Sequence, residues 1–209
     1  MKLNVNFIFF FICLAITIFI SDFIDTGHKL DNLRGNVLRL HILANSDSDD
    51  DQQLKLCVRD ALLENADEVF GNCDTLENAV ENAENALGKA EEIAENVVRE
   101  KGYDYEVSAE IDDMFFTERH YGEITMPKGM YKALRIKIGE ANGHNWWCVM
   151  YPPLCLPMAD KVVDSEEVKE EFFTDDEIEI MEKPKKFRVR FMLWDKLKAC
   201  FFDEKEDIS

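Results

Sequence analysis

The chain has 209 residues, with 43 acidic and 24 basic side chains and a formal net charge of −19. A protein this acidic repels the phosphates of nucleic acids, so its net charge argues against binding to nucleic acid. The length after residue 26 is that of one domain, and we expect one globular domain over residues 27–209.

The amino terminus carries an apolar block. Residues 7–20 are uncharged and lie between Lys2 and Asp22, which predicts that the start stays in the cytoplasm and the rest is exported. As a helix these residues span about 21 Å, less than the ~30 Å core of a bilayer, and this suits the apolar region of a signal peptide. No small-residue cleavage pattern follows, however. Residues 1–26 are therefore predicted to be either a cleaved signal peptide or a membrane anchor.

A strand and a helix are predicted next. Over residues 37–44, leucine and isoleucine alternate with Arg39 and His41, which is typical of a strand. Ser48 and Asp51 have the spacing of a capping box, and an apolar stripe from residue 54 to 62 predicts the helix that follows. The aspartates between residues 47 and 51 also resemble part of a calcium loop. That loop's glycine and final glutamate are missing, so helix capping is the preferred interpretation.

The middle of the chain alternates helix and strand patterns. A long helix is predicted from residue 74 to 101, where apolar residues recur at steps of three and four and Gly102 follows. Strict alternation over residues 103–112 predicts a strand with one acidic face, which residues 114–116 would extend, and residues 121–126 predict a weaker strand.

The most informative stretch holds two of the three tryptophans. Residues 134–138 and 146–151 are predicted to pair as an antiparallel hairpin, because Asn142-Gly143 supplies a tight turn between them. On the second strand both faces are apolar, with Trp147, Val149 and Tyr151 on one side and Trp146, Cys148 and Met150 on the other. Such a strand is central and covered on both sides, or it keeps one face for a partner.

The carboxy-terminal part changes composition. Residues 164–183 are rich in acids and predict an exposed helix at residues 165–173. Alternation over residues 187–193 predicts a last strand, followed by a short helix that carries Trp194 and Leu197. The expected fold class is α+β, an antiparallel sheet of about five or six strands packed by two long helices, with a short carboxy-terminal helix.

The cysteines admit several chemistries. A nucleophilic Cys148 needs a histidine base, yet His144 lies about 13 Å away along a strand, and His41 or His120 would have to approach instead. A zinc site from His144, Cys148 and Cys155 lacks the short paired spacing of structural zinc sites, and we expect no metal or cofactor. A disulfide between Cys148 and Cys155 is possible because Pro152-Pro153 turns the chain between them. The alternative is two buried thiols.

Two blocks of the sequence resemble a known family. The run from Arg39 to Asp47, continued by residues 51–60, and the run from Gly143 to Cys155 with Gly139-Glu140 closely resemble the stage II sporulation protein R family. With the membrane-directed start and residues 189–191, the resemblance covers most of residues 1–195.

The resemblance implies a non-enzymatic signalling protein of endospore-forming bacteria. Such a protein is exported from the forespore into the space between the forespore and mother-cell membranes, secreted or anchored by residues 7–20. Its implied partner is a membrane-embedded aspartic protease, the stage II sporulation protein GA, which processes the pro-form of sigma factor E.

The resemblance transfers no contact residues, so the predicted partner-binding residues are physical choices. They are the aromatic strand with its proline loop and the polar strand-to-helix turn: His41, Asn45, Asp47, Trp146, Trp147, Tyr151, Pro152 and Pro153. Two other classes stay open, an extracytoplasmic hydrolase that uses Cys148 and a structural module without a signalling role.

Overall fold

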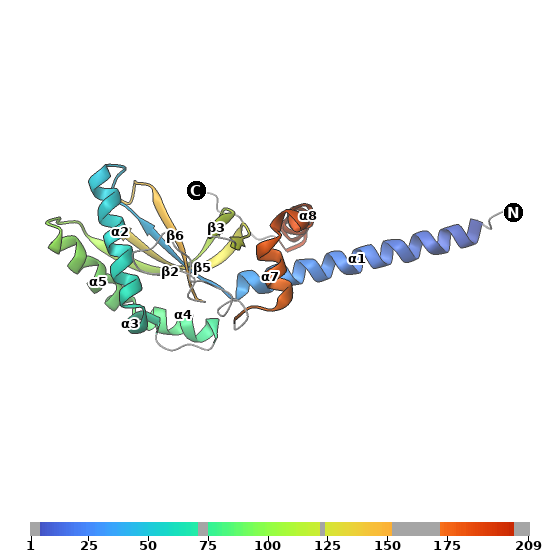
Figure 1. The fold of residues 1–209 in the computed structure, drawn as a ribbon, viewed down its shortest axis with the longest axis horizontal. Helices are drawn as coiled ribbons and strands as arrows, with labels where there is room; N and C mark the ends of the chain where they lie inside the picture. Colours follow the sequence, from blue (N-terminus) through green and yellow to red (C-terminus); the bar gives the residue numbers. More distant parts are fainter. Residues whose placement is uncertain (1–4, 71–74, 122–123, 152–171, 203–209) are drawn as a thin grey trace. The chain divides into compact units, whose positions relative to one another are not determined.

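The computed structural model spans residues 1–209 and describes all of them except 1–4, 71–74, 122–123, 152–171 and 203–209 (Figure 1). The chain divides into two compact units, which we describe separately. The helical unit comprises residues 1–33 and 175–209, and the sheet unit comprises residues 34–174.

The sheet unit contains a mixed sheet and a small hairpin. Its four-stranded sheet has the order β2-β5-β1-β6, and β3 pairs with β4 in a second sheet. Strand β1 is parallel to β5 and antiparallel to β6, while β2 is antiparallel to β5. The α+β class is confirmed, whereas the expectation of an entirely antiparallel sheet is wrong. In chain order the elements are β1 (Leu38–Leu43), α2 (Asp49–Glu64), α3 (Ala66–Phe70), α4 (Leu76–Asn85), α5 (Leu87–Glu100), β2 (Val107–Phe116), β3 (Arg119–Tyr121), β4 (Ile124–Met126), β5 (Gly129–Ile138) and β6 (Asn145–Tyr151).

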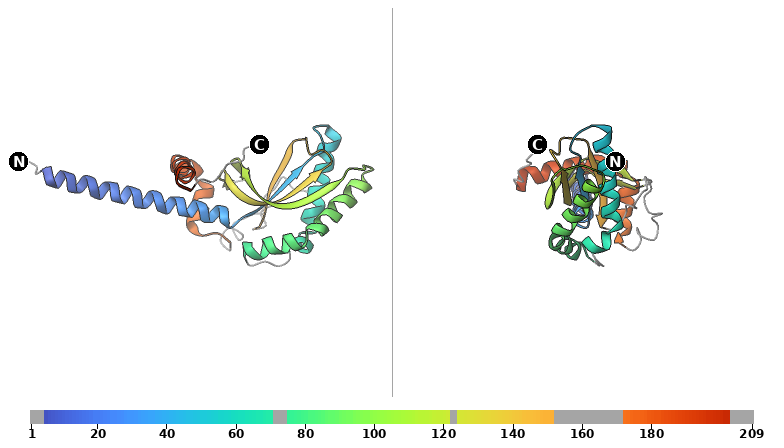
Figure 2. Two further views of the ribbon diagram at one scale, coloured as in Figure 1. Left: turned by 180° about the vertical axis from the view of Figure 1, so that it is seen from behind. Right: turned by 90° about the vertical axis from the view of Figure 1, so that its left-hand side faces the viewer.

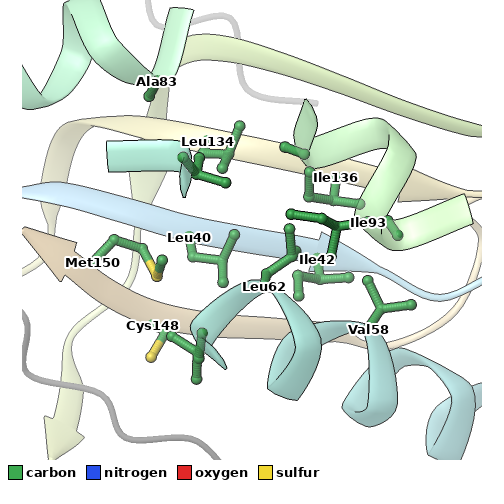
Figure 3. Close-up of a cluster of buried hydrophobic side chains, with 14 of the residues drawn as sticks. Leu40, Ile42, Val58, Leu62, Ala83, Ile93, Leu134, Ile136, Cys148 and Met150 are labelled. Atoms are coloured by element: carbon green, nitrogen blue, oxygen red, sulfur yellow. The ribbon is translucent and has the colours of Figure 1, made fainter. Parts of the chain in front are cut away.

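One face of the four-stranded sheet carries the hydrophobic core. Helices α2, α4 and α5 gather on this side of the sheet in both views (Figures 1 and 2). Leu40 and Ile42 of β1 lie beside Leu134 and Ile136 of β5, and the helices contribute residues such as Leu62 (Figure 3). Because aliphatic side chains stand at every second position of the strands, one face of the sheet can be wholly apolar.

Strand β1 occupies a place that the sequence pattern did not predict. It lies between β5 and β6, so residues 134–138 and 146–151 are not hairpin partners. A central position for the tryptophan strand is also wrong, because β6 lies at the edge of the sheet. Positive φ angles occur at Gly139 and Ala141, not at the expected Asn142-Gly143. The central position of β1 agrees with its burial. All six of its residues are buried, which requires a strand that is paired on both edges and covered on both faces.

The long helix expected over residues 74–101 is two helices. Helix α4 begins after its N-cap Thr75. The helical conformation is interrupted at Ala86, and α5 begins at the next residue. The buried residues on the two helices include alanines, which let their backbones pack closely: Ala79, Ala83, Ala90 and Ala94. The start of α2 agrees with the prediction, since the Ser48 hydroxyl accepts a hydrogen bond from the Asp51 backbone N–H.

The remaining strand boundaries differ in detail. The strand expected over residues 103–112 begins at Val107 and does extend to Phe116. The weak strand expected over residues 121–126 is the β3–β4 hairpin. Most of the helix expected at residues 165–173 lies outside the described residues.

The helical unit consists of α1 (Val5–Gly35), up to Leu33, with α7 (Asp175–Glu182) and α8 (Pro184–Phe202). Among the described residues, α1 is the one helix long and apolar enough to cross a membrane. Its apolar side chains between Phe7 and Ile20 are exposed, which fits a signal or anchor segment. The helix continues past residue 26, and the proposed division between an amino-terminal segment and the domain stays a prediction.

The strand expected over residues 187–193 is wrong, because these residues belong to α8. Pro184 stands at the first helical position, where its missing N–H costs no hydrogen bond. Phe187, Phe191 and Trp194 are buried at helical spacing. In so short a run, apolar residues at every second position do not distinguish a strand from a helix.

The sheet unit predicts a large cost for shortening a side chain at its centre. Leu40 is fully buried in the core cluster, so Leu40→Ala should lower the free energy of unfolding by about 2–5 kcal/mol. The matched control is Ser108→Ala, at an exposed position of β2, with a change within about 0.5 kcal/mol. Urea unfolding followed by tryptophan fluorescence measures both, and equal losses would contradict this core.

Candidate functional site: a buried arginine among aromatic rings

The face of the sheet opposite the helices carries polar and aromatic residues. On β1, Arg39 and His41 alternate with the core leucines, and both are buried. We call the following group the aromatic cluster: Arg39, His41, Phe116, Tyr121, Tyr131 and Trp147. Its members come from β1, β2, β3, β5 and β6, so the cluster forms only when all these strands are in place.

Arg39 is the centre of the cluster. Its guanidinium carbon lies 4.1 Å from the ring centroid of Phe116, 5.0 Å from that of Tyr131 and 5.8 Å from that of Tyr121. Its Nη2 atom donates a hydrogen bond of 2.5 Å to the Tyr121 hydroxyl. The Nε and Nη1 atoms have no hydrogen-bond partner among the described residues. The faces of aromatic rings therefore replace water around this cation.

Phenol ionisation does not neutralise Arg39 at ordinary pH. Burial raises the pKa of Tyr131 to about 12 and also raises the pKa of Tyr121. Burial lowers the pKa of Arg39, but an arginine stays protonated in proteins. The Tyr131 hydroxyl donates instead to the Pro127 carbonyl at 2.6 Å. The cluster thus holds a positive charge that only ring faces and one hydroxyl stabilise among the residues described.

The imidazole ring of His41 is neutral near pH 7 and stacks on the indole of Trp147. The two ring centroids are 4.0 Å apart, and the ring planes differ by 4°. Burial lowers the pKa of His41 to about 4, and the positive charge of Arg135 adds to this shift. The side chain of Asn145 acts in the opposite direction, and its effect on this pKa is the weaker one. His41 is 2% exposed, so its predicted part in binding would act through Trp147.

Trp147 connects the cluster to the surface. Its indole is half-buried and lies edge-to-face with Phe116 at 4.7 Å between centroids. The guanidinium of Arg119, an exposed residue of β3, lies 5.6 Å from the indole centroid. The Tyr121 hydroxyl also donates to the Trp147 carbonyl at 3.4 Å. The stack fixes the orientation of this indole before any partner arrives.

Asn45, at the predicted strand-to-helix turn, is tied to the chain between β5 and β6. Its Oδ1 accepts from the Glu140 backbone N–H at 3.0 Å, and its Nδ2 donates to Asp51 Oδ2 at 2.9 Å. Both ends of the amide are therefore used inside the molecule. A Cβ atom on Gly139 would collide with the Asn45 side chain, so the glycine permits this contact.

Asp47 and Lys55 hold His144 from two sides. Asp47 Oδ1 accepts from the His144 backbone N–H and lies 2.5 Å from His144 Nδ1. These bonds lower the pKa of Asp47. Lys55 donates to the His144 carbonyl at 2.8 Å. The side chains of Asp47 and His144 are 56% and 81% exposed, so this pair stays accessible to a partner.

The other predicted contact residues lie on the face of the sheet that the helices cover, or outside the described residues. Trp146 is half-buried, with the Arg59 guanidinium 4.3 Å from its ring centroid. The expectation that Tyr151 shares a face with Trp147 is wrong, because a register shift opposite Leu38 and Arg39 moves Tyr151 into the core cluster. Pro152 and Pro153 lie outside the described residues. A role of these residues in partner binding stays a prediction.

Cys148 is 2% exposed and is disulfide-bonded. Cys155 lies outside the described residues, so the pairing of Cys148 with Cys155 stays a prediction. A sulfur in a disulfide has no thiolate, which argues against the hydrolase alternative. Within the described part of the chain, no group of three histidine, cysteine or acidic side chains is placed to hold a metal ion.

Most of the aromatic cluster does not follow from the sequence pattern. Phe116, Tyr121 and Tyr131 are far apart in the sequence and come together only through the order of the strands. One feature of the sequence indicated that Arg39 is buried. Both faces of the tryptophan strand are apolar and need to be covered, so a strand paired with it also has both faces covered, including the face that carries Arg39.

Comparisons with known proteins give one consistent result. The profile of stage II sporulation protein R matches residues 34–161. A Bacillus subtilis (strain 168) protein named stage II sporulation protein R is 35% identical over 136 residues, which are 63% of this chain and 61% of that protein. The chain thus matches less than two thirds of the relative's length. No solved structure matches. The matched residues include every strand of the sheet unit.

The lowered pKa of His41 predicts that acid weakens the sheet unit. The unfolded chain takes up this proton near pH 6.5, whereas the folded chain resists it until about pH 4. The free energy of unfolding should therefore fall by about 2 kcal/mol between pH 7.5 and 5.0 from this group. Urea unfolding at the two pH values measures the change.

Two variants isolate the contribution of His41. His41→Phe keeps a flat ring against Trp147 and should remove the fall. His144→Gln, at an exposed histidine, should retain it. A pH dependence that His41→Phe leaves unchanged would contradict the assignment.

Proposed function

Because the chain belongs to the stage II sporulation protein R family, we propose that it is an exported sporulation signal that activates a membrane-embedded aspartic protease. The protease is stage II sporulation protein GA, and its activation leads to processing of the pro-form of sigma factor E. The chain acts from the space between the forespore and mother-cell membranes. This proposal combines the family with the apolar helix α1, which fits export.

The aromatic cluster supports a role as a ligand. Trp147 presents a half-buried indole whose orientation is set by His41 and Phe116. Arg119 adds a cation at the margin of the indole. Tryptophan and arginine are among the residue types that most often dominate the binding energy of protein interfaces, and a rigid surface loses little entropy on binding. This single observation carries the proposed contact surface.

Activation then follows from differential binding. A protease that is mostly inactive shifts from 1:99 to 99:1 in favour of its active arrangement if the ligand prefers that arrangement by about 5.5 kcal/mol. A few well-packed aromatic and arginine contacts are sufficient for a difference of this size. No bond in the ligand is made or broken in this mechanism.

The direct test reconstitutes the protease and this chain in one membrane and follows cleavage of pro-sigma factor E. Arg119→Ala removes an exposed cation beside Trp147 without opening the core and should weaken activation at least about tenfold. Trp147→Ala should weaken it further, while Trp147→Phe, which keeps a ring on His41, separates contact from folding.

The matched control for Arg119→Ala is Lys101→Ala, which removes an exposed cation at the end of α5. It should activate like the natural chain. Trp146→Ala should have the smaller effect of the two tryptophan changes, because Arg59 covers its ring on the helix side. Full activation by a folded Trp147→Ala chain would refute the contact surface.

Two further tests separate the alternative functions. A hydrolase that uses Cys148 would lose all activity on Cys148→Ser with the fold verified, whereas a ligand would retain its binding. A purely structural module would leave processing of the sigma factor unchanged when its gene is deleted.

A further inference from the structure

Helix α8 has apolar side chains on two faces. One face, with Phe187, Phe191 and Trp194, is buried. The other face has four large apolar residues at helical spacing with exposed fractions of 65%, 43%, 45% and 40%: Val189, Met192, Leu193 and Leu197. Within the described residues nothing covers this second face, which is unusual for so many apolar groups on one helix.

The buried face of α8 fixes it against α1. The Trp194 indole N–H donates to Asp31 Oδ2 at 3.0 Å, and its ring lies edge-to-face with Phe23 at 5.8 Å between centroids. Gly27 permits this approach, because a Cβ atom there would collide with the indole. Arg190 adds an ion pair of 2.7 Å with Asp22. Helix α8 therefore docks on the part of α1 that directly follows the apolar block.

This position corresponds to the surface of a membrane that α1 crosses. Phe23 lies about 4.5 Å beyond Ile20 along the helix axis, and Asp31 about 16 Å beyond it. The headgroup region on each side of a bilayer is about 5–8 Å thick. The contacts of Trp194 thus begin within the headgroup layer at Phe23 and end about 8–11 Å outside it at Asp31.

The charge of α8 selects the kind of surface. The helix has six basic residues and one acidic residue, Asp195, in a chain whose net charge is −19. Lys185 and Lys196 share the exposed face with the apolar residues. Lysine stems can lie along apolar surface while their ammonium groups reach lipid phosphates. Two such faces from two copies of the chain would bring like charges together, which disfavours a second copy as the occupant.

We propose that the exposed face of α8 lies on the surface of an anionic lipid bilayer, with Val189, Met192, Leu193 and Leu197 in the boundary between headgroups and acyl chains. Lys185 and Lys196 contact the lipid phosphates. Amphipathic helices with basic residues bind membranes in this manner. The bulk acidity of the chain opposes contact, and α1 overcomes it by holding α8 at the surface. This proposal concerns the helical unit, and its failure would leave the proposed activation of a protease intact.

The test uses the full chain, inserted through α1 into vesicles of phosphatidylcholine with or without phosphatidylglycerol. Leu193→Trp places a probe on the exposed face, and Phe115→Trp places a matched probe at a 49% exposed position of the sheet unit. Both chains are labelled with 5-fluorotryptophan, and each new fluorine resonance is assigned by comparison with the natural chain. An aqueous gadolinium chelate and a nitroxide on the lipid chains then report which phase each probe contacts.

In vesicles with phosphatidylglycerol, the gadolinium effect at position 193 should be at least threefold weaker than at position 115, and the nitroxide effect stronger. The double change Lys185→Gln and Lys196→Gln should weaken docking roughly 25-fold, at about fivefold for each lysine. The matched double change Lys101→Gln and Lys128→Gln, at exposed positions of the sheet unit, should have no effect.

Several results would overturn the proposal. Equal gadolinium access at positions 193 and 115 in both vesicle types would show that α8 does not meet lipid. Equal protection with and without phosphatidylglycerol would exclude the anionic headgroups. Protection that depends on the density of the chain in the membrane would assign the face to a second copy, and protection that requires added protease would assign it to that partner.

Discussion

The burial of strand β1 is the constraint on which the sheet unit depends. All six of its residues are buried, with Leu38, Leu40 and Ile42 toward the helices and Arg39 and His41 on the other face. Removing a cation from water costs several kcal/mol even after a protein relaxes, and one cation–π contact returns about 2 kcal/mol when desolvated. One ring is therefore insufficient. Three rings and a hydroxyl surround the guanidinium, and this requirement brings β2, β3 and β5 together over β1.

The same constraint prepares the surface on which the proposed function rests. His41 follows Arg39 on the same face of β1 and stacks on Trp147 of the neighbouring strand. Because burial keeps His41 neutral near pH 7, the stack carries no charge of its own, and Arg119 supplies the cation beside the exposed part of the indole. The turn between β5 and β6 is held separately by Asn45 and Asp47. A partner would meet a surface that is already ordered, which lowers the entropic cost of binding.

The sequence predicted the local elements better than their arrangement. The capping of α2 by Ser48 follows from neighbouring residues and was found correctly. The position of β1 between β5 and β6 depends instead on pairing with residues about 95–110 positions later in the chain, and no local pattern states that. Helix α8 was mistaken for a strand because short apolar runs fit both periods, although Pro184 and the spacing of Phe187, Phe191 and Trp194 favoured a helix. The rings around Arg39 come from separate strands, so only the tertiary fold assembles them.

In the proposed function, this chain works by being bound and not by catalysis. The most direct measurement varies the amount of the chain against a fixed amount of reconstituted protease and follows the steady rate of pro-sigma factor E cleavage. A ligand predicts that the rate rises in proportion to the occupied protease and saturates when every binding site is filled. A rate that reaches its maximum with a trace of the chain, given enough time, would show turnover and contradict the account.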